Sequence, residues 1–243
     1  MRTVSPRGCG GRPDTAARTE TMVIGYRYTA GPMDAHARTL LINGLADLHI
    51  DATDAVVDRL CALADLVVEW NERFNLTAIT EPEAMVRKHL LDSLTVQPYV
   101  RGPRVIDVGT GAGFPGLPLA ILNPQIHFQL VDSIRKKIGF VTHAAGVLGL
   151  ANVEPVCSRA ERFQPDERAQ TIVSRALSNV GEFVRNTSHL ATTDGRLLAM
   201  KGKDPSAECM ELPRPWRLAG IERLHVPGLA DERHLAILER PRS

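Results

Sequence analysis

The stretch VIDVGTGAGFPG, residues 105–116, decides the fold of this chain. Its apolar start has the composition of a buried strand, and glycines follow directly at positions 109, 111 and 113. Glycine permits positive φ and lets a ligand come close to the backbone. A helical pattern begins after Gly116, so the amino end of a helix faces the same space. A strand, a glycine-rich turn and a helix in this order predict a cofactor-binding βα unit.

Strand and helix patterns alternate on the carboxyl side of this unit. The candidate strands are Arg104–Val108, His127–Val131, Val153–Cys157, Thr171–Ser174, Arg196–Lys201 and His234–Glu239. Helical stretches fall between most of them, notably Ile134–Leu148 and Val180–Leu190. This alternation predicts an α/β fold with a parallel sheet covered on both faces. Ligands of such a sheet gather at the carboxyl ends of its strands.

The amino-terminal part of the chain has a helical period. Apolar residues recur at steps of three and four and form one stripe: Val57, Leu60, Leu63, Val67, Trp70 and Phe74. Asp51 or Thr53 is expected to cap that helix. A second helix is expected to begin near Glu81-Pro82 and to carry Met85, His89, Leu90 and Leu94.

The chain therefore divides into three parts. Residues 1–32 are rich in Arg, Gly and Pro and have little to bury, so we expect a disordered tail, with Met22 and Met33 offering later starts. Residues 33–98 form a helical region, and residues 99–243 form the domain that carries the glycine loop. We expect these two parts to pack as one unit.

Composition and charge exclude several classes of protein. Of the 243 residues, 44% are hydrophobic, which suits a domain with its own core, and no run approaches the 18 apolar residues of a membrane span. The formal charge is +1, but residues 1–32 hold five arginines and two acids, so the rest carries +24 − 26 = −2. Binding of nucleic acid would then require a concentrated basic patch. Four cysteines without CxxC spacing predict reduced thiols in a cytoplasm, with neither a disulfide framework nor a metal site.

Two cofactor classes compete for the glycine loop. Residues 111–116 satisfy GxGxxG, the fingerprint of dinucleotide enzymes, so an NAD(P)-dependent oxidoreductase is one interpretation. Pro115 fits poorly in the helix of that fingerprint, and Asp107 stands where its strand is usually apolar. An acid followed by GxGxG is the pattern of S-adenosylmethionine-dependent methyltransferases. In that case Asp107 reaches the α-amino group of the cofactor, directly or through water.

Two later segments add candidate cofactor contacts. Asp132 ends the second strand, 23 residues after Gly109, where its carboxylate can accept both ribose hydroxyls in either cofactor class. Its alternative role is to cap the next helix. Residues 157–161 follow the third strand, where a methyltransferase contacts adenine, often through backbone amides.

Seven motifs in order carry a more specific resemblance. They are WNERFNLT at 70–77, KHLLDSL at 88–94, DVGTGAGFPG at 107–116, Val131-Asp132-Ser133 with Lys136-Lys137, Arg159-Ala160-Glu161, Ser174-Arg175-Ala176 and Met200-Lys201-Gly202. From about Val57 to Glu239 the chain resembles the bacterial small-subunit ribosomal RNA guanine-N7 methyltransferases, the RsmG (formerly GidB) family.

The resemblance implies a Rossmann-like methyltransferase fold with an N-terminal helical extension. It implies S-adenosyl-L-methionine as the cofactor and 16S ribosomal RNA, within the small ribosomal subunit, as the substrate. The family's cofactor site corresponds here to Gly109, Phe114, Ala160, Glu161 and Arg175, and the loop pattern adds Asp107, Gly111, Gly113 and Asp132.

Methyl transfer to N7 of guanine uses a ring nitrogen that carries a free lone pair, so no general base is required. We assign no residue to acid–base catalysis and expect positioning and desolvation to carry the reaction. Arg175 and Lys201 are assigned to positioning. The alternative role of Arg175 is a buried structural salt bridge.

The lysines are candidates for holding RNA. Arginine supplies 24 of the 29 basic residues, and the lysines all lie in the motif segments: Lys88, Lys136, Lys137, Lys201 and Lys203. We expect RNA contacts from five residues of these motifs, namely Lys88, Lys136, Lys201, Arg175 and His89, although His89 is equally suited to the core. Lys137 and Lys203 are expected to be solvated.

Other motif residues are expected to have structural roles. Trp70 and Phe74 belong to the apolar stripe, so packing is favoured over base stacking. Asn71, Asn75 and Thr77 are expected to brace the loop over the cofactor pocket. The sequence thus predicts a cytoplasmic rRNA (guanine-N7) methyltransferase. A methyltransferase for another RNA or a small molecule, the oxidoreductase and a non-catalytic RNA-binding module stay open as alternatives.

Overall fold

The computed structural model describes residues 22–23, 26–27, 33–175 and 178–241. The predicted disorder of residues 1–32 lies for the most part outside the described residues. Within that segment, β1 (Met22–Val23) and β2 (Tyr26–Arg27) pair as a short antiparallel ribbon.

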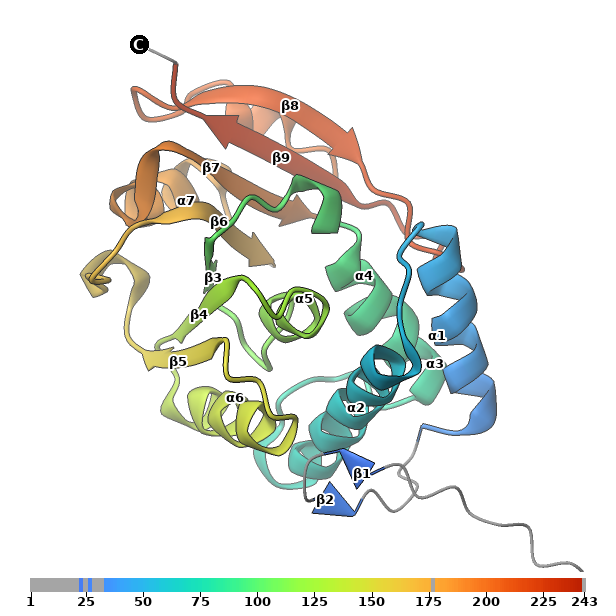
Figure 1. Ribbon diagram of the computed structural model, residues 1–243. Helices are drawn as coiled ribbons and strands as arrows, with labels where there is room; N and C mark the ends of the chain where they lie inside the picture. Colours follow the sequence, from blue (N-terminus) through green and yellow to red (C-terminus); the bar gives the residue numbers. More distant parts are fainter. Residues whose placement is uncertain (1–21, 24–25, 28–32, 176–177, 242–243) are drawn as a thin grey trace, which may run out of the picture.

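A seven-stranded sheet forms the centre of the fold, in the order β5-β4-β3-β6-β7-β9-β8 (Figure 1). Five strands are parallel: β3 (Arg104–Val108), β4 (His127–Asp132), β5 (Val153–Cys157), β6 (Ala169–Arg175) and β7 (Ala191–Lys201). At the far edge, β9 (His234–Glu239) runs antiparallel to both β7 and β8 (Arg217–Arg223).

All six predicted strands are present, but the sheet is not wholly parallel and its edge strand β8 was not predicted. Edge strands have one unpaired side and much exposed surface, and β8 is largely exposed and contains Gly220. Its sequence therefore lacks an apolar pattern. Strand β7 begins at Ala191 and not at Arg196 as predicted. Its first five residues were missed because they are mostly polar and lack the pattern of a strand.

Helices cover the two faces of the sheet unequally. One face carries α5 (Gly116–Leu122) and α6 (Arg135–Val147) together with the amino-terminal helices. The other face carries α7 (Val180–Thr187) and the short helices η3 (Ala160–Arg162), η4 (Ser188–Leu190) and η5 (Ser206–Cys209). Two buried hydrophobic clusters, one on each face, follow this division.

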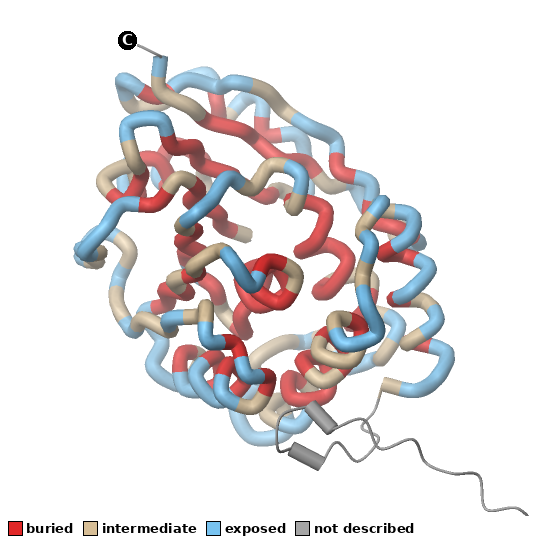
Figure 2. Tube along the Cα trace, viewed as in Figure 1, coloured by how far each residue is buried: buried red, intermediate tan, exposed pale blue. Residues whose placement is uncertain are grey.

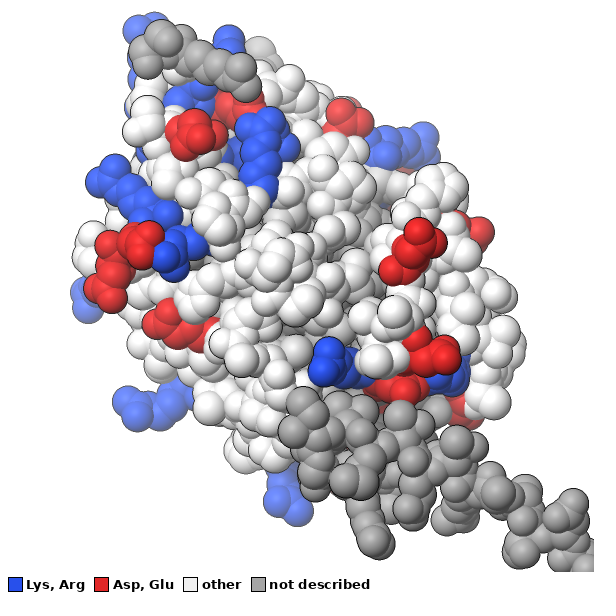
Figure 3. Space-filling view, in the orientation of Figure 1, with Lys and Arg blue, Asp and Glu red and all other residues white. Residues whose placement is uncertain are grey.

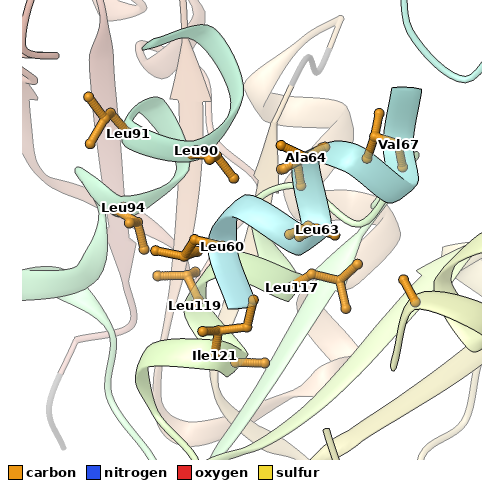
Figure 4. Packing of buried hydrophobic residues seen from close by; sticks show 14 of the residues in the cluster. Leu60, Leu63, Ala64, Val67, Leu90, Leu91, Leu94, Leu117, Leu119 and Ile121 are labelled. Atoms are coloured by element: carbon orange, nitrogen blue, oxygen red, sulfur yellow. The ribbon is translucent and has the colours of Figure 1, made fainter. Parts of the chain in front are cut away.

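The amino-terminal region consists of α1 (Ala35–Asp47), α2 (Asp54–Phe74), α3 (Pro82–Met85), a π-helical segment η1 (Val86–Leu91), α4 (Asp92–Leu94) and the 3-10 turn η2 (Gln97–Tyr99). The predicted stripe of α2 is confirmed from Val57 to Val67, and Thr53 is its N-cap residue. Figure 4 shows leucines of α2 meeting those of α4 and α5. No helix in the described ranges is long and apolar enough to span a membrane.

Helix α5 lies at the middle of this packing. Six of its seven residues, from Gly116 to Ile121, are buried, and Figure 2 shows the helix surrounded by other elements. A helix that is apolar all round must be covered on all sides. The sheet covers one side, and α2 and α4 cover the others. The amino-terminal helices and the sheet thus share one hydrophobic cluster.

Candidate functional site

The glycine loop opens at the carboxyl end of β3. Gly109, Gly111 and Gly113 have φ of 70°, 62° and 83°, a region that disfavours residues with a side chain. A Cβ atom on Gly109 or Gly111 would meet no heavy atom closer than 3.9 Å, whereas one on Gly113 would lie 2.2 Å from Leu117 Cδ1. The first two glycines therefore leave an open cradle above the backbone, and the third permits the loop to pack on α5.

Asp107 lies fully buried beneath this loop. Its Oδ2 accepts hydrogen bonds from Thr110 Oγ1 at 2.6 Å and from the backbone nitrogen of Gly116 at 2.9 Å. Burial raises the pKa of Asp107 to about 6. Its Oδ1 is buried without a hydrogen-bond partner among the described residues. The carboxylate thus fastens the loop to the start of α5, and the predicted contact with a cofactor amino group stays a prediction.

Asp132 ends β4 on the other side of the loop. Its Oδ2 accepts from the backbone nitrogen of Gly111 at 3.0 Å, and its Oδ1 accepts from that of Ile134 at 2.8 Å. Lys137 Nζ lies 3.8 Å from Oδ2 and its side chain is 29% exposed, so the lysine that was predicted to be solvated is half-buried beside Asp132. Because a carboxylate oxygen has two lone pairs, these bonds leave Asp132 with capacity for further donors.

The third strand brings its following segment to the same edge. Asp132 pairs with Cys157 across the sheet, and the backbone nitrogen of Ser158 donates to the Asp132 carbonyl oxygen at 3.1 Å. Ala160 and Glu161 then begin the short helix η3, where Glu161 is exposed. The parallel register therefore brings both of these predicted residues to the edge of the sheet where Asp132 and the glycine loop lie.

Phe114, His89 and Arg175 form a stacked group beside the loop. The ring of His89 lies 4.7 Å from that of Phe114 with an interplanar angle of 10°, and the Arg175 guanidinium carbon lies 5.3 Å from the Phe114 centroid. Arg175 NH2 is 3.1 Å from His89 Nδ1, and Thr77 Oγ1 is 2.9 Å from His89 Nε2. The sequence offered both a core and an RNA-contacting role for His89, and the structure places it in this buried group.

The protonation of His89 follows from these partners. Burial, reinforced by the charge of Arg175, lowers the pKa of His89 to about 3. A guanidinium can only donate, so Nδ1 of the neutral imidazole accepts from Arg175 and Nε2 carries the proton toward Thr77. Both ring nitrogens are engaged inside the protein, while the ring itself lines the cavity beside Arg175, so the predicted RNA contact stays a prediction.

Asp92 joins Arg175 to a second arginine. Arg175 NH1 lies 3.1 Å from Asp92 Oδ2, and Arg233 Nε lies 2.9 Å from Asp92 Oδ1. Asp92 is 3% exposed. The buried salt bridge considered as an alternative for Arg175 is therefore present. Arg233 lies just before β9 and belongs to none of the seven motifs. No pattern in the sequence marked it as part of this site.

A cavity of about 620 Å³ opens beside these arginines. Its lining includes more basic than acidic side chains: Lys88, Arg175, Lys201, Lys203 and Arg233 against Asp92 and Glu208. Lys201 Nζ also binds Glu208 Oε1 at 2.9 Å, which holds it at the cavity wall.

Lys136 has a different position from the one expected. Its Nζ donates to the carbonyl oxygen of Phe74 at 3.0 Å and so joins α6 to the carboxyl end of α2. It does not line the cavity that contains Lys88 and Lys201. This contact gives Lys136 a structural role, and its predicted RNA contact stays a prediction.

The aromatic residues pack as expected, whereas bracing of the loop over the cofactor pocket by Asn71, Asn75 and Thr77 stays a prediction. Trp70 packs against Phe74, Phe140 and His143 with ring centroids 5.1–5.6 Å apart, which confirms packing over base stacking. Asn71 Oδ1 accepts from the backbone nitrogen of Thr77 at 2.9 Å, and Thr77 in turn contacts the stacked group through its hydroxyl. Asn75 ends α2 in the left-handed conformation.

Comparison with known proteins identifies the family. The model of the family described as "GidB: rRNA small subunit methyltransferase G" matches residues 57–236. The chain belongs to this family. The GidB-family chain is 46% identical over 183 residues to the ribosomal RNA small subunit methyltransferase G of Aeromonas salmonicida, covering 75% of this chain and 88% of that protein. It is 43% identical over 205 residues to the protein of the same name from Pseudomonas syringae pv. tomato, covering 84% and 97%.

Solved structures show the same fold at low sequence identity. TrmN from Thermus thermophilus superposes with a TM-score of 0.51 at 22% identity, over 70% of this GidB-family chain and 53% of that one. A SAM-dependent O-methyltransferase from Thermotoga maritima gives a TM-score of 0.50 at 13% identity, over 73% and 72%. The predicted Rossmann-like methyltransferase fold is confirmed, and the family sets aside the oxidoreductase alternative.

Proposed function

We propose that this protein transfers a methyl group from S-adenosylmethionine to N7 of a guanine in 16S ribosomal RNA. The observation that carries the proposal is one juxtaposition. The open glycine cradle at the end of β3 adjoins a cationic cavity through the stacked group of Phe114, His89 and Arg175. A site for a cofactor and a site for an anionic substrate thus share one wall.

The cradle fits the cofactor. Gly109 and Gly111 have open space where a side chain would stand, and Asp132 supplies a carboxylate with remaining acceptor capacity beside them. When bound, S-adenosylmethionine supplies the electrophilic methyl group. We assign its binding to a set of residues at the carboxyl edge of the sheet: Gly109, Gly111, Gly113, Phe114, Asp132, Ala160, Glu161 and Arg175. Asp107 holds the loop in shape from below.

The chemistry of N7 does not require the site to supply a free base. The N7 lone pair is available without loss of a proton, so the protein has to orient the base and exclude water. His89 is neutral with both nitrogens engaged, and Phe114 is buried at 2% exposure. The ring of His89 lines the cavity, and the buried ring of Phe114 stacks on it from behind. Arg175 and Lys201 project from the ends of neighbouring strands and position the substrate.

The charge pattern fits an RNA that presents a single nucleotide. The N7 edge is hidden in the deep groove of an A-form helix, so the target guanine has to come from a loop or an opened junction. On the face shown in Figure 3, basic side chains lie at the rim and near acidic ones, without a broad basic surface. The cavity residues Lys88, Lys201, Lys203 and Arg233 supply the concentrated patch that a body of charge −2 requires. A cytoplasmic location goes with this substrate.

The test is methyl transfer to the RNA itself. Small subunits and their 16S RNA are prepared from a strain that lacks the gene and are incubated with labelled S-adenosylmethionine. We expect label in 16S RNA at one guanine, which chemical cleavage at 7-methylguanine then locates. Label at another atom or in another RNA would support a different methyltransferase. Calorimetry with S-adenosylhomocysteine checks cofactor binding separately.

A further inference from the structure

A second cavity adjoins the cationic one. It has a volume of about 500 Å³ and lies between the start of α1, α3 and the loop at Gly228 and Leu229. Lys88 lines both cavities. We propose that the second cavity binds the base of a nucleotide next to the target guanine, with Lys88 on the phosphate that joins the two. This inference rests on the proposed function and names how the same site reads the RNA around its target.

Lys88 stands at a fixed place relative to the reacting site. Its backbone oxygen accepts a hydrogen bond from Arg175 NH1 at 3.0 Å, within the π-helical segment η1. Its ammonium has no hydrogen bond or ion pair to any residue that the structure describes, and its side chain is half-buried. A lysine serves as a point charge for phosphate. An RNA strand carries one phosphate between successive bases, and Lys88 is the cation between the two cavities.

The second cavity has the chemistry of a base site and not of a phosphate site. Glu81 is exposed at its rim and has no ion-pair partner among the described residues. Glu83 is shared between His36 at 3.2 Å and Arg87 at 3.3 Å. Carboxylates repel phosphate but accept hydrogen bonds from the amino groups of bases, as in the pairing of Glu or Asp with cytosine N4. Arg87 adds a planar guanidinium on which a base can stack.

The size and position of the cavity suit a flanking nucleotide. Enzymes that act on an extruded base take their sequence context from contacts to the nucleotides on either side. A cavity of about 500 Å³ lies within the range that holds a ligand of nucleotide size. Because Glu81 accepts and cannot donate, the preferred neighbour carries an amino group, and uracil is the poorest occupant.

The experiment compares Glu81→Gln with a matched control. Glu69→Gln changes another exposed carboxylate, on α2, that lines neither cavity. The full-length proteins methylate small subunits assembled with 16S transcripts in which each nucleotide flanking the target is changed to every other base. For wild type and Glu69→Gln we expect kcat/KM to fall about tenfold with uracil at one flank. For Glu81→Gln we expect a raised KM on the best RNA, an unchanged affinity for S-adenosylhomocysteine and loss of that preference.

Lys88→Ala separates the phosphate contact from the base contact. We expect KM to rise for all of the RNAs alike and the salt dependence of RNA binding to decrease by about one unit of slope. The neighbouring-base site is overturned if Glu81→Gln keeps the preference of wild type, or if wild type is indifferent to both flanks. Wild type that binds S-adenosylhomocysteine but methylates none of the RNAs would instead overturn the proposed function.

Discussion

The imidazole of His89 lies parallel to the ring of Phe114, with centroids 4.7 Å apart and 10° between the planes. Phe114 belongs to the glycine loop and His89 to the π-helical segment η1, so this stack joins the cofactor cradle to the amino-terminal region. Arg175 then binds His89 Nδ1 and fixes the stack from β6. Three elements far apart in the sequence thus hold one wall of the site.

His89→Phe tests the nitrogen apart from the ring. Phenylalanine keeps an aromatic ring against Phe114 but leaves Arg175 NH2 without its acceptor, which costs about 1–3 kcal/mol in a buried site. We expect kcat/KM to fall at least tenfold while the fold is retained. His89→Ala also removes the stack, and we expect it to weaken S-adenosylhomocysteine binding further in calorimetry. Wild-type kinetics for His89→Phe would show that only the ring matters.

Asp92→Asn tests the carboxylate between the two arginines. Loss of this charge leaves Arg175 and Arg233 without a common partner, and breaking one member of a buried ion pair costs about 3–5 kcal/mol. Both arginines are partly exposed, so we expect the lower end of that range together with a loss of RNA methylation. Denaturant unfolding and kinetics of Asp92→Asn, Arg233→Lys and the double variant measure the coupling. Additive effects would contradict a shared role.

Gly111→Ala and Gly113→Ala separate ligand binding from folding. Both residues have positive φ, which costs alanine about 1–2 kcal/mol. A methyl group on Gly113 also collides with Leu117, so we expect Gly113→Ala to lower the melting temperature more strongly. A methyl group on Gly111 has open space and enters the cradle, so we expect it chiefly to lower S-adenosylhomocysteine affinity. The prediction fails if the two variants lose affinity and stability in equal proportion.

Asp65→Asn tests a buried carboxylate outside the site. Burial raises the pKa of Asp65 from 3.8 to about 6. Between about pH 4 and pH 6 the folded protein binds more protons at this group than the unfolded chain, so its contribution to the free energy of unfolding falls as pH rises. Between pH 4.5 and pH 7.5 we expect the free energy of unfolding of wild type to fall by about 2 kcal/mol more than that of the variant. His89 and Asp107 titrate in both proteins, so equal changes in urea unfolding would contradict the prediction.

Removal of residues 1–32 tests the role of the tail. In a chain that begins at Met33, the terminal ammonium takes the place of the backbone nitrogen that donates to Asp65 Oδ1 at 2.9 Å. A positive charge beside a buried carboxylate is favourable. We therefore expect full methylation activity and a melting temperature at least equal to that of the complete chain. Loss of activity would assign a function to the tail.

The sequence was informative where local pattern and sheet register determine position. The run from Val105 to Gly116 predicted β3, the glycine loop and α5, because strand, turn and helix each have a local signature. Asp132 and Arg175 were placed correctly at the carboxyl edge of the sheet, because the carboxyl ends of parallel strands meet at one edge.

The remaining site residues depend on contacts that have no local signature. Arg233 meets Asp92 across 141 residues of sequence, and no motif marks it. Lys136 donates to the backbone oxygen of Phe74, and every residue has such an oxygen, so the sequence does not mark this partner. The π-helical turn that carries His89 has hydrogen bonds that do not follow the usual helical period. Each of these features is decided by tertiary packing.

The burial of α5 has a consequence for attempts to recombine this protein with its relatives. Because α2 and α4 cover apolar sides of α5 that the sheet leaves bare, a fragment that begins at residue 99 would present a hydrophobic helix to water. In a chimera that joins the first hundred residues of one protein to the remainder of another, α2 and α4 must therefore fit the apolar side chains of an α5 that comes from the other protein. The cofactor loop and the amino-terminal helices therefore have to be transferred together.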